Sequence, residues 1–438
     1  MKIKIDHIAK IEGHAGFVAD IASGNVTKAR LDIREGARLL EGILQGRSHN
    51  EVSQIAARIC GVCPVVHTLA SLKALEAAMG VSVSQQTILL RELLMMGQIL
   101  NSHALHLFFF SLSDFFGFKD DFAAIKKYPA KAKDALLIRD FGNRIIEVIG
   151  GRSIHPLTPE VGGFKKLPDI KKLKELLLLA DKALKLAIDF AQFFAKLKYP
   201  EFKRQCQFIS LTSPHYYAIY DGPIAVDGKD ALKIEDFMPQ ISESQVMDNP
   251  AIKRSEFGGA PYMVGALARI NYSAKYLNLK AKAVLRLSGL NLPSANPFHN
   301  ILAQAIEIVH CVEEAQKLLG QVIELSVPDI DLPFGGSSQW DPRLNVGQSR
   351  QRGGKGFSAI EAPRGTLFYY YEVGDDGLIK GANIITPTSQ NIGRLEKDLE
   401  EYIPALTKKG KVVCGEKCED QIKMLVRAYD PCLTCATH

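Results

Sequence analysis

Two hydrophobic periodicities divide the chain. Near the N-terminus, short runs rich in β-branched and apolar residues at 16–21 and 28–33 flank Gly24-Asn25, a pair typical of hairpin turns. Further on, apolar positions recur every three to four residues, as in amphipathic helices, over 51–78, 85–116, 169–198 and 300–325. Helices of about 30 residues would be roughly 45 Å long. The pattern therefore predicts a long-helix bundle with a small N-terminal β-sheet.

The last quarter of the chain has a different character. Residues 328–365 are rich in proline and glycine, which is typical of loops. Alternating runs at 365–373 and 378–385 predict a β-hairpin, and a short helix at about 393–402 and a polar tail follow. We find no repeats, low-complexity blocks or linkers. We therefore predict one α+β, predominantly helical domain over 1–438, with a β-rich part at 1–50, a helical bundle at 51–327 and a loop-rich part at 328–438.

Composition narrows the class of protein. Hydrophobic residues make up 47% of the chain and charged residues 23%, and the net charge of +6 is spread along 438 residues, which gives no indication of nucleic-acid binding. The most apolar run, 89–116, contains Arg91, Glu92, His103, His106 and Asp114, so a buried helix is expected rather than a membrane span. The N-terminus has no apolar segment typical of a secretory signal. We therefore expect a cytoplasmic protein.

Eight cysteines are too few for a disulfide-stapled domain of this length. They lie at positions 60, 63, 206, 311, 414, 418, 432 and 435, so six of them form three close pairs. The pairs make metal ligation the first hypothesis. Cys414 and Cys418 have no assignable role, with free thiols as the default, and Cys206 and Cys311 are expected in the core.

Two C-x-x-C motifs carry the clearest chemistry. One lies in Arg58-Ile-Cys60-Gly-Val-Cys63-Pro-Val-Val-His67, and the other in Asp430-Pro-Cys432-Leu-Thr-Cys435-Ala-Thr-His438. Four soft thiolates select zinc, iron–sulfur clusters, copper(I) or nickel. A structural zinc site is the commonest use of such pairs. Against zinc, the two pairs lie almost a whole chain apart, and a large helical domain needs no metal to fold.

The two motifs resemble the signatures of nickel–iron hydrogenase large subunits. Further segments are similar to that family, namely Lys10-Ile-Glu12-Gly-His14, 41–47, 150–156, 264–269 (with Ala266 where proline is usual), Ala362-Pro363-Arg364-Gly365 and Thr386-Pro387-Thr388. The resemblance covers nearly the whole chain. It implies the family's large-subunit fold and the reversible oxidation of dihydrogen to protons and electrons.

The resemblance also implies the ligands of the catalytic metals. Cys60 and Cys432 match the terminal nickel thiolates, and Cys63 and Cys435 match those that bridge nickel to an iron carrying carbon monoxide and cyanide. Arg364 would lie over the open metal position, where its guanidinium suits a cyanide or a polarised substrate.

Other matches imply residues that support catalysis. Thr388 and backbone N–H groups near Pro387 would hydrogen-bond the other cyanide. Glu12 matches the carboxylate that takes protons from the Cys432 sulfur. Asp114 and Asp430 match acidic residues that pair with the arginine, and His67 matches a hydrogen-bond donor to a bridging sulfur.

A second metal site is also implied. Glu41, His438 and the backbone carbonyl of Ile384 match the ligands of a buried Mg²⁺ or Fe²⁺ near the C-terminus. Oxygen donors suit magnesium and histidine suits iron, so the identity of the ion stays open. In the family an extension after this histidine is commonly removed once nickel is loaded, so we expect His438 to be the end of a processed chain or of a gene without the extension.

Two segments indicate the branch of the family. Residues 5–10 and 103–108 are similar to the soluble cytoplasmic group, which includes sulfhydrogenase alpha subunits and NAD(P)-linked enzymes. The chain has no G-x-G-x-x-G after a strand, so an acceptor such as NAD(P) must bind a partner. The resemblance implies an iron–sulfur small subunit, which would hold the iron–sulfur clusters, and flavin/NAD(P)-binding diaphorase subunits. It also implies a maturation endopeptidase and a nickel chaperone.

Two alternatives to a catalytic subunit remain at this point. One is a non-catalytic coupling subunit like the quinone-site subunit of respiratory complex I, whose members have generally lost the nickel cysteines that this chain keeps. The other is a structural zinc protein. The electron acceptor, oxygen tolerance, catalytic direction and number of subunits do not follow from the sequence.

Overall fold

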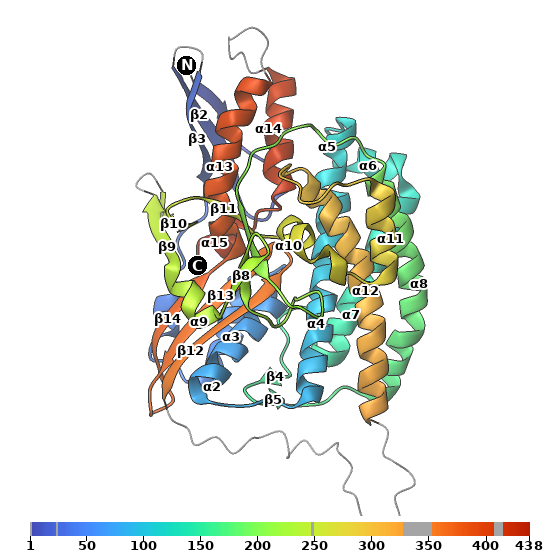
Figure 1. Ribbon diagram of the computed structural model, residues 1–438, viewed down its shortest axis with the longest axis vertical. Coiled ribbons are helices and arrows are strands. Elements are labelled where there is room, and N and C mark those ends of the chain that lie inside the picture. The colour runs from blue at the N-terminus through green and yellow to red at the C-terminus, as the bar shows by residue number, and fades with distance from the viewer. Residues whose placement is uncertain (1, 23–24, 247–248, 327–352, 407–414) are drawn as a thin grey trace, which may run out of the picture.

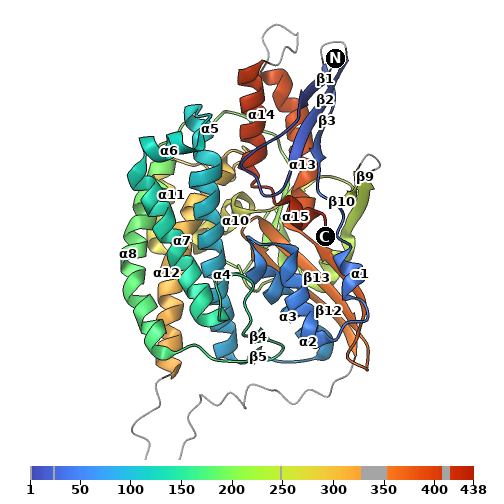
Figure 2. The same ribbon diagram turned by 180° about the vertical axis from the view of Figure 1, so that it is seen from behind.

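The computed structural model describes residues 2–22, 25–246, 249–326, 353–406 and 415–438. Four long helices pack against one another as a bundle: α4 (Gln85–Leu105), α7 (Pro129–Gly150), α8 (Ile170–Ala195) and α12 (His299–Ser326). Smaller sheets and the remaining helices lie beside this bundle (Figures 1 and 2). The predicted α+β fold with a long-helix bundle is confirmed, and α7 is an addition to the helices that the sequence predicted.

Shorter helices surround the sheets and close the bundle. They are α1 (Leu40–Leu44), α2 (His49–Ala56), α3 (Pro64–Met79), α5 (Leu112–Phe116), α6 (Asp121–Lys127), α9 (Ile234–Phe237), α10 (Ala266–Ser273), α11 (Leu279–Ser288), α13 (Pro387–Ala405), α14 (Glu416–Ala428) and α15 (Leu433–Ala436). Short 3₁₀ turns cover Ala57–Ile59, Met238–Gln240 and Ala274–Tyr276, and a π-helical turn covers His106–Ser111.

The strands form small sheets. An antiparallel N-terminal sheet contains β1 (Lys2–Ile5), β2 (Ala15–Ala22) and β3 (Asn25–Ile33), and a second contains β12 (Gly354–Ala362), β13 (Gly365–Val373) and β14 (Ile379–Ile385). A four-stranded sheet has the order β11 (Tyr262–Met263), β6 (Gln207–Leu211), β7 (Ile224–Val226), β8 (Lys229–Leu232). Two-stranded pairs join β9 (Ile241–Val246) to β10 (Asn249–Phe257) and β4 (Pro159–Glu160) to β5 (Gly163–Phe164).

The apolar segment that begins at α4 packs as a core helix. Residues Gln85–Phe116 form the one helical stretch, among the described residues, that is long and apolar enough to cross a membrane, and 83% of its most apolar window is buried inside the protein. The buried Arg91 has a partner there, since it donates to both oxygens of Glu76 at 2.8 and 2.6 Å. Gly97 lets α7 approach, because a Cβ there would lie 2.8 Å from the Gly142 carbonyl oxygen. These contacts fix the helix inside the bundle.

Several sequence predictions were wrong in detail. The predicted helix at 51–78 is interrupted between α2 and α3, where the first cysteine motif lies. Part of the segment predicted as loop is the strand β12, and the rest of it largely lies outside the described residues. The predicted polar tail contains α14 and α15. Cys418, expected as a free thiol, is disulfide-bonded, and Cys414 lies outside the described residues.

Candidate metal centre

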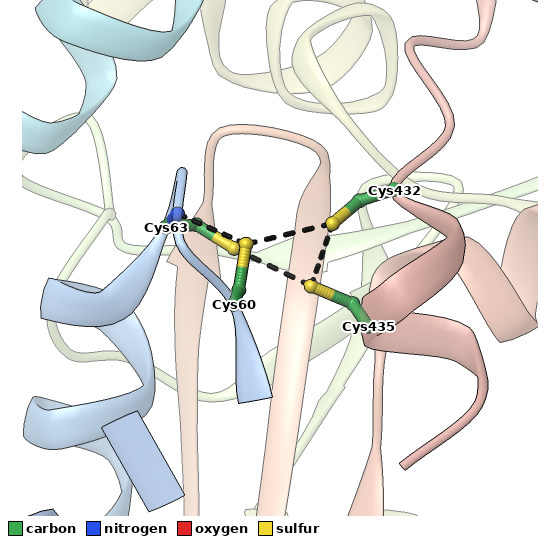
Figure 3. Close-up of side chains that lie close together, drawn as sticks. All are labelled: Cys60, Cys63, Cys432 and Cys435. Atoms are coloured by element: carbon green, nitrogen blue, oxygen red, sulfur yellow. Dashed lines mark hydrogen bonds between the residues drawn. The ribbon is translucent and has the colours of Figure 1, made fainter. Parts of the chain in front are cut away.

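Four cysteine side chains from the two ends of the sequence meet between α3 and α15 (Figure 3). The sulfur atoms of Cys60 and Cys432 are 3.6 Å apart, those of Cys63 and Cys435 3.4 Å, and those of Cys432 and Cys435 2.8 Å. All four sulfurs lie within 4.8 Å of one another, and all four residues are buried. The structure thus brings together the four cysteines that the two motifs singled out.

Local backbone geometry orients the side chains of the first cysteine pair. Cys60 is in an extended conformation at the end of the Ala57–Ile59 turn, and Cys63 caps the N-terminus of α3, with Pro64 in the first helical position. The backbone N–H groups of Val62 and Cys63 donate to the Cys60 sulfur at 3.2 and 3.1 Å. These donors stabilise a thiolate at Cys60.

The second pair is anchored by the N-terminal segment and by α13. Asp430 has a φ of 49°, in the left-handed region, which turns the chain from α14 toward the cysteines. The N–H of Leu433 donates to the Glu12 carbonyl at 2.9 Å, and the N–H of Cys432 donates to the Thr388 hydroxyl at 3.0 Å. The second motif is therefore held by two segments that are distant in sequence from it and from each other.

Arg38 ties the two cysteine motifs together. Its guanidinium donates to the Ile59 carbonyl at 2.8 Å, just before Cys60, and to the carbonyl of Thr434, between Cys432 and Cys435. Its backbone N–H also donates to the Thr437 carbonyl at 2.9 Å. One charged side chain thus bridges loops that carry opposite sides of the sulfur cluster.

Glu12 lies against the Cys432 sulfur. Its Oε2 is 3.0 Å from that sulfur and accepts from the Thr434 N–H at 3.1 Å, while its Oε1 accepts from the Thr434 hydroxyl at 2.6 Å. Burial, followed by the negative charge of Cys432, raises the pKa of Glu12 to about 7. A carboxyl group with this pKa, in contact with a thiol, is suited to exchanging a proton with it.

Arg364 is fixed by Asp430. Its Nε donates to the Asp430 carbonyl at 2.7 Å and its Nη2 lies 3.0 Å from the Asp430 carboxylate, while Nη1 is 3.5 Å from the Ser102 hydroxyl. Asp430 in turn accepts from Gln304 at 3.1 Å. Burial disfavours the charge, but Asp430 and the cysteine thiolates hold the pKa of Arg364 well above its ordinary value. The arginine is therefore a permanent buried cation beside the sulfurs.

The expected pairing of Asp114 with Arg364 is wrong in this structure. Asp114 lies in α5, which follows the π-helical turn, and pairs with Arg427 of α14 instead. The side chain of Arg427 also donates to the Ala9 carbonyl at 2.9 Å. Burial raises the pKa of Asp114 to about 6. Of the two expected acidic partners, Arg364 has only Asp430 among the described residues.

His67 lies beside the sulfur of Cys435, with its Nε2 at 3.6 Å. Its Nδ1 is 2.8 Å from the Tyr369 hydroxyl. Burial lowers the pKa of His67 to about 3, so the ring is neutral. When the tyrosine hydroxyl donates to Nδ1, the ring proton resides on Nε2 and faces the sulfur.

A small cavity adjoins the sulfurs, and its wall is mostly apolar. Val66, Ala362, Pro363, Leu367 and Pro387 line it, together with His67, Arg364, Thr388, Cys63, Cys432 and Cys435. The wall thus presents the guanidinium of Arg364, from the turn between β12 and β13, and the hydroxyl of Thr388, from the first turn of α13. Such a space excludes bulk water from the sulfurs.

The three expected ligands of a second metal also converge. The N–H of Ile384 donates to Glu41 at 2.9 Å, and the Nε2 of His438 lies 2.8 Å from the Ile384 carbonyl and 4.0 Å from the Glu41 carboxylate. The ammonium group of Lys253 lies 2.9 and 3.1 Å from the two Glu41 oxygens. A cationic group is thus already paired with Glu41.

The donor set fits a soft redox metal. Burial alone would raise the pKa of the Cys60 thiol, but hydrogen bonds from the other three cysteines and the charge of Arg364 hold it well below its ordinary value. Nickel and iron are soft or borderline ions, and thiolates in a site without water are the ligands that bind such ions. A closed structural zinc site would not need the carboxyl group, the buried arginine or the adjoining cavity.

Five residues of this site were missed by sequence reasoning: Arg38, Ser102, Gln304, Tyr369 and Thr434. Each acts through a contact between distant segments. Thr434 alone gave a usable signal, because it lies inside the second C-x-x-C motif, where its hydroxyl and N–H must be close to the cysteines.

A family model described as nickel-dependent hydrogenase matches residues 38–144 and 227–438. The alpha chain of sulfhydrogenase 1 from Pyrococcus furiosus is 33% identical over 442 residues, which cover 100% of this chain and 98% of that protein. The matching chain of the F420-non-reducing hydrogenase from Methanothermobacter thermautotrophicus is 29% identical, covering 100% and 95% respectively.

The solved structures that resemble this chain are also hydrogenases. The structure of an NAD⁺-reducing [NiFe]-hydrogenase in its H₂-reduced state has a TM-score of 0.85 and 28% identity, covering 100% of this chain and 99% of that one. The Ni-Fe-Se hydrogenase of Desulfomicrobium baculatum has a TM-score of 0.73, with 100% of both chains covered, and its identity of 23% indicates a shared fold.

Replacing Arg38 should loosen the site. In the variant Arg38→Ala the carbonyls of Ile59 and Thr434 lose a charged donor, which should cost about 2 kcal/mol or more of stability. We expect a lower melting temperature and a faster loss of metal to a chelator. Arg34→Ala is the matched control, since Arg34 is exposed and pairs with Asp32 at the surface. Equal melting temperatures and equal metal loss for the two variants would contradict the bridging role.

Proposed function

The chain belongs to the nickel-dependent hydrogenase family and is the catalytic subunit of a nickel–iron hydrogenase, and from this premise we propose roles for the residues around its sulfurs. The enzyme oxidises dihydrogen reversibly to protons and electrons. The observation that carries the proposed roles is the contact of the Glu12 carboxyl, at 3.0 Å, with the sulfur of Cys432 inside the four-cysteine cluster.

The four cysteines would hold a nickel–iron centre. Bound there, the metals supply the redox chemistry that splits dihydrogen and releases two electrons. We assign Cys60 and Cys432 as terminal nickel ligands and Cys63 and Cys435 as the ligands shared with iron. The neighbours of the sulfurs support this division, because Cys432 faces a carboxyl group and Cys435 faces a neutral imidazole.

Proton transfer would begin at Cys432. Its sulfur holds the proton that leaves dihydrogen, and Glu12 Oε2, at 3.0 Å, accepts it. Thr434 keeps the carboxyl in place through its hydroxyl and its N–H. The pKa of Glu12, raised to about 7, allows the carboxyl to take the proton and release it again near neutral pH.

Arg364 and Thr388 would hold the diatomic ligands of the iron. We propose carbon monoxide and cyanide for this role, with the guanidinium of Arg364 donating to one cyanide. The Thr388 oxygen accepts the Cys432 N–H at 3.0 Å, which leaves its own hydrogen free to donate to the other cyanide. The apolar wall around them keeps water away and strengthens both hydrogen bonds.

A second cation, Mg²⁺ or Fe²⁺, would bind Glu41, His438 and the Ile384 carbonyl. The His438 Nδ1 is 2.6 Å from the Cys435 carbonyl and must donate to it. Burial holds the pKa of His438 below its ordinary value, so the neutral ring presents the lone pair of Nε2 to the Ile384 carbonyl at 2.8 Å. Two facing acceptors are stabilised by a cation between them. Binding would require the Lys253 ammonium to move off Glu41.

Electrons would leave through partners. Homologues of this chain are the large subunits of heteromeric hydrogenases that also contain a small subunit. We propose that the small subunit carries iron–sulfur clusters and passes electrons to flavin/NAD(P)-binding diaphorase subunits in the cytoplasm. The 28% identity to an NAD⁺-reducing enzyme over the whole chain supports this acceptor. A nickel chaperone and a maturation endopeptidase would assemble the buried centre.

Glu12→Gln tests the proton route. Glutamine keeps the size of the side chain but cannot take up a proton, so hydrogen-dependent dye reduction should fall by about 100-fold or more while nickel stays bound. Glu35→Gln is the control, because that carboxylate contacts His14 and not the cysteines. Wild-type turnover in Glu12→Gln would refute the role.

Glu41→Gln tests the second cation. Losing the carboxylate charge should remove the bound Mg²⁺ or extra Fe²⁺ found by elemental analysis of the purified complex. Nickel should be retained, since Glu41 does not contact the four cysteines. A divalent ion that stays at its wild-type ratio to nickel in this variant would contradict the proposed ligand set.

A further inference from the structure

A second cavity, of about 300 Å³, shares no lining residue with the sulfur-lined space. It lies where α4, α12, the start of α11 and the segment 215–220 between β6 and β7 meet. The helices α4 and α12 lie side by side in the bundle (Figure 1). Since one water takes up about 30 Å³ in the liquid, the cavity holds far more than a single ordered water.

One carboxylate in this cavity has no direct partner. Glu92, on α4, has no hydrogen bond or ion pair with any residue that the structure describes. Burial, then the charges of Glu314 and Asp221, raise the pKa of Glu92 to about 7. The Lys73 ammonium acts on this pKa in the opposite direction, but it is paired with Asp221 at 3.1 Å, so no cation among the described residues contacts the Glu92 carboxylate.

The neighbouring polar groups are already engaged or fixed. Glu314 accepts from the Asn278 side chain at 2.7 Å and from Lys317 at 3.3 Å, so the cation that lines the cavity is taken. His310, only 3% exposed, accepts the Asn278 N–H on Nδ1 at 3.2 Å. Burial lowers the pKa of His310 to about 4, so the ring is neutral and carries its proton on Nε2. Across the described ranges, that Nε2–H has no acceptor.

Aromatic rings form the rest of the wall. Tyr217 donates its hydroxyl to Glu307 and Tyr220 accepts from Arg91, so both line the cavity with their rings. The Lys73 ammonium already lies 4.5 Å from the centre of the Tyr220 ring, which leaves the rings of the other tyrosines for a further cation. Tyr216 is 47% exposed, and Tyr276 is the other tyrosine of the lining. A carboxylate beside aromatic faces matches the guanidinium group, which pairs with the charge and stacks on the ring.

We propose that this cavity receives an arginine side chain of the iron–sulfur small subunit; the partner named here rests on the proposed function. The surroundings favour a protein over a small organic cation. Tyr216 lines the cavity and is exposed, and Leu279, which directly follows the lining residue Asn278, is 80% exposed. Arginines in aromatic pockets are typical anchors of protein interfaces.

A chain of buried contacts joins this cavity to the metal centre. Tyr217 donates to Glu307 at 2.6 Å, Arg269 donates to Glu307 at 2.6 and 2.7 Å, and Arg269 also donates to the Ala362 carbonyl at 3.1 Å, two residues before Arg364. An electron-accepting partner must approach the metal centre. A docking cavity whose wall is rigidly connected to the Arg364 loop is consistent with that requirement.

The test uses the purified heteromeric holoenzyme with Glu92→Gln or Glu92→Lys in this chain. We expect the dissociation constant for the small subunit, measured by dilution in the analytical ultracentrifuge, to rise about tenfold or more for glutamine and further for lysine. Glu324→Gln is the control, because Glu324 is an exposed residue on α12 outside the cavity and should leave the dissociation constant unchanged.

A second measurement covers the case in which a variant folds poorly. Tyr216→Cys carrying a short photo-crosslinker should form a covalent product with the small subunit. Unchanged dissociation constants for both Glu92 variants, or no cross-link to the small subunit, would overturn the proposal. Stoichiometric binding of free guanidinium or L-arginine to the intact complex would also overturn it, because the cavity would then be open to small cations.

A different measurement tests the proposed hydrogenase function. A wild-type complex without hydrogen-dependent dye reduction would refute hydrogenase activity, whereas the comparison of dissociation constants does not depend on turnover. At concentrations where the complex is intact, Glu92→Gln should retain wild-type nickel content and turnover, because Glu92 does not line the sulfur-lined cavity.

Discussion

The convergence of four buried cysteines from the two ends of the chain is the constraint on which the rest of the structure depends. Thiolates crowded within 4.8 Å of one another in a dry interior repel each other unless a cation or shared protons lie between them. The N-terminal strand region, the start of α3, α13 and the C-terminal residues all meet at this point. Arg38 holds the two motifs together, and Thr388 and the backbone of Glu12 hold the second one in place. The site is therefore a product of tertiary contacts rather than of either motif alone.

Buried charge is the second theme. Arg364 and Arg269 are both almost completely buried, and each is matched by carboxylates and carbonyl oxygens: Arg364 by Asp430, and Arg269 by Glu307 and Glu361. Burying such groups is costly unless the pairing is complete. The arrangement restricts Arg364 to one position beside the sulfurs and keeps it charged. The arrangement thus places a fixed positive charge next to four sulfurs that become anionic as thiolates.

The sequence predicted the features that depend on neighbouring residues and missed those that depend on contacts between distant segments. The period of the apolar residues predicted the long helices, and the cysteine motifs predicted the four-cysteine cluster. Glycines misled at β12, because Gly354 and Gly356 mark a close approach to α3 rather than a loop: a Cβ on Gly356 would lie 2.1 Å from the Ala74 carbonyl oxygen. The pairing of Asp114 with Arg427 had no sequence signal, since it depends on how α5 meets α14. The apolar spacing of Ile422, Leu425 and Val426 could have identified α14.

The most direct test of the central claim is the infrared spectrum of the purified holoenzyme, combined with its metal content. Carbon monoxide and cyanide bound to iron give stretching bands in a region where ordinary proteins have none. The account predicts such bands together with one nickel per chain, and their loss together with nickel when Cys435 is replaced by serine. Zinc in place of nickel, with no such bands, in protein from cells that contain the maturation machinery would contradict it.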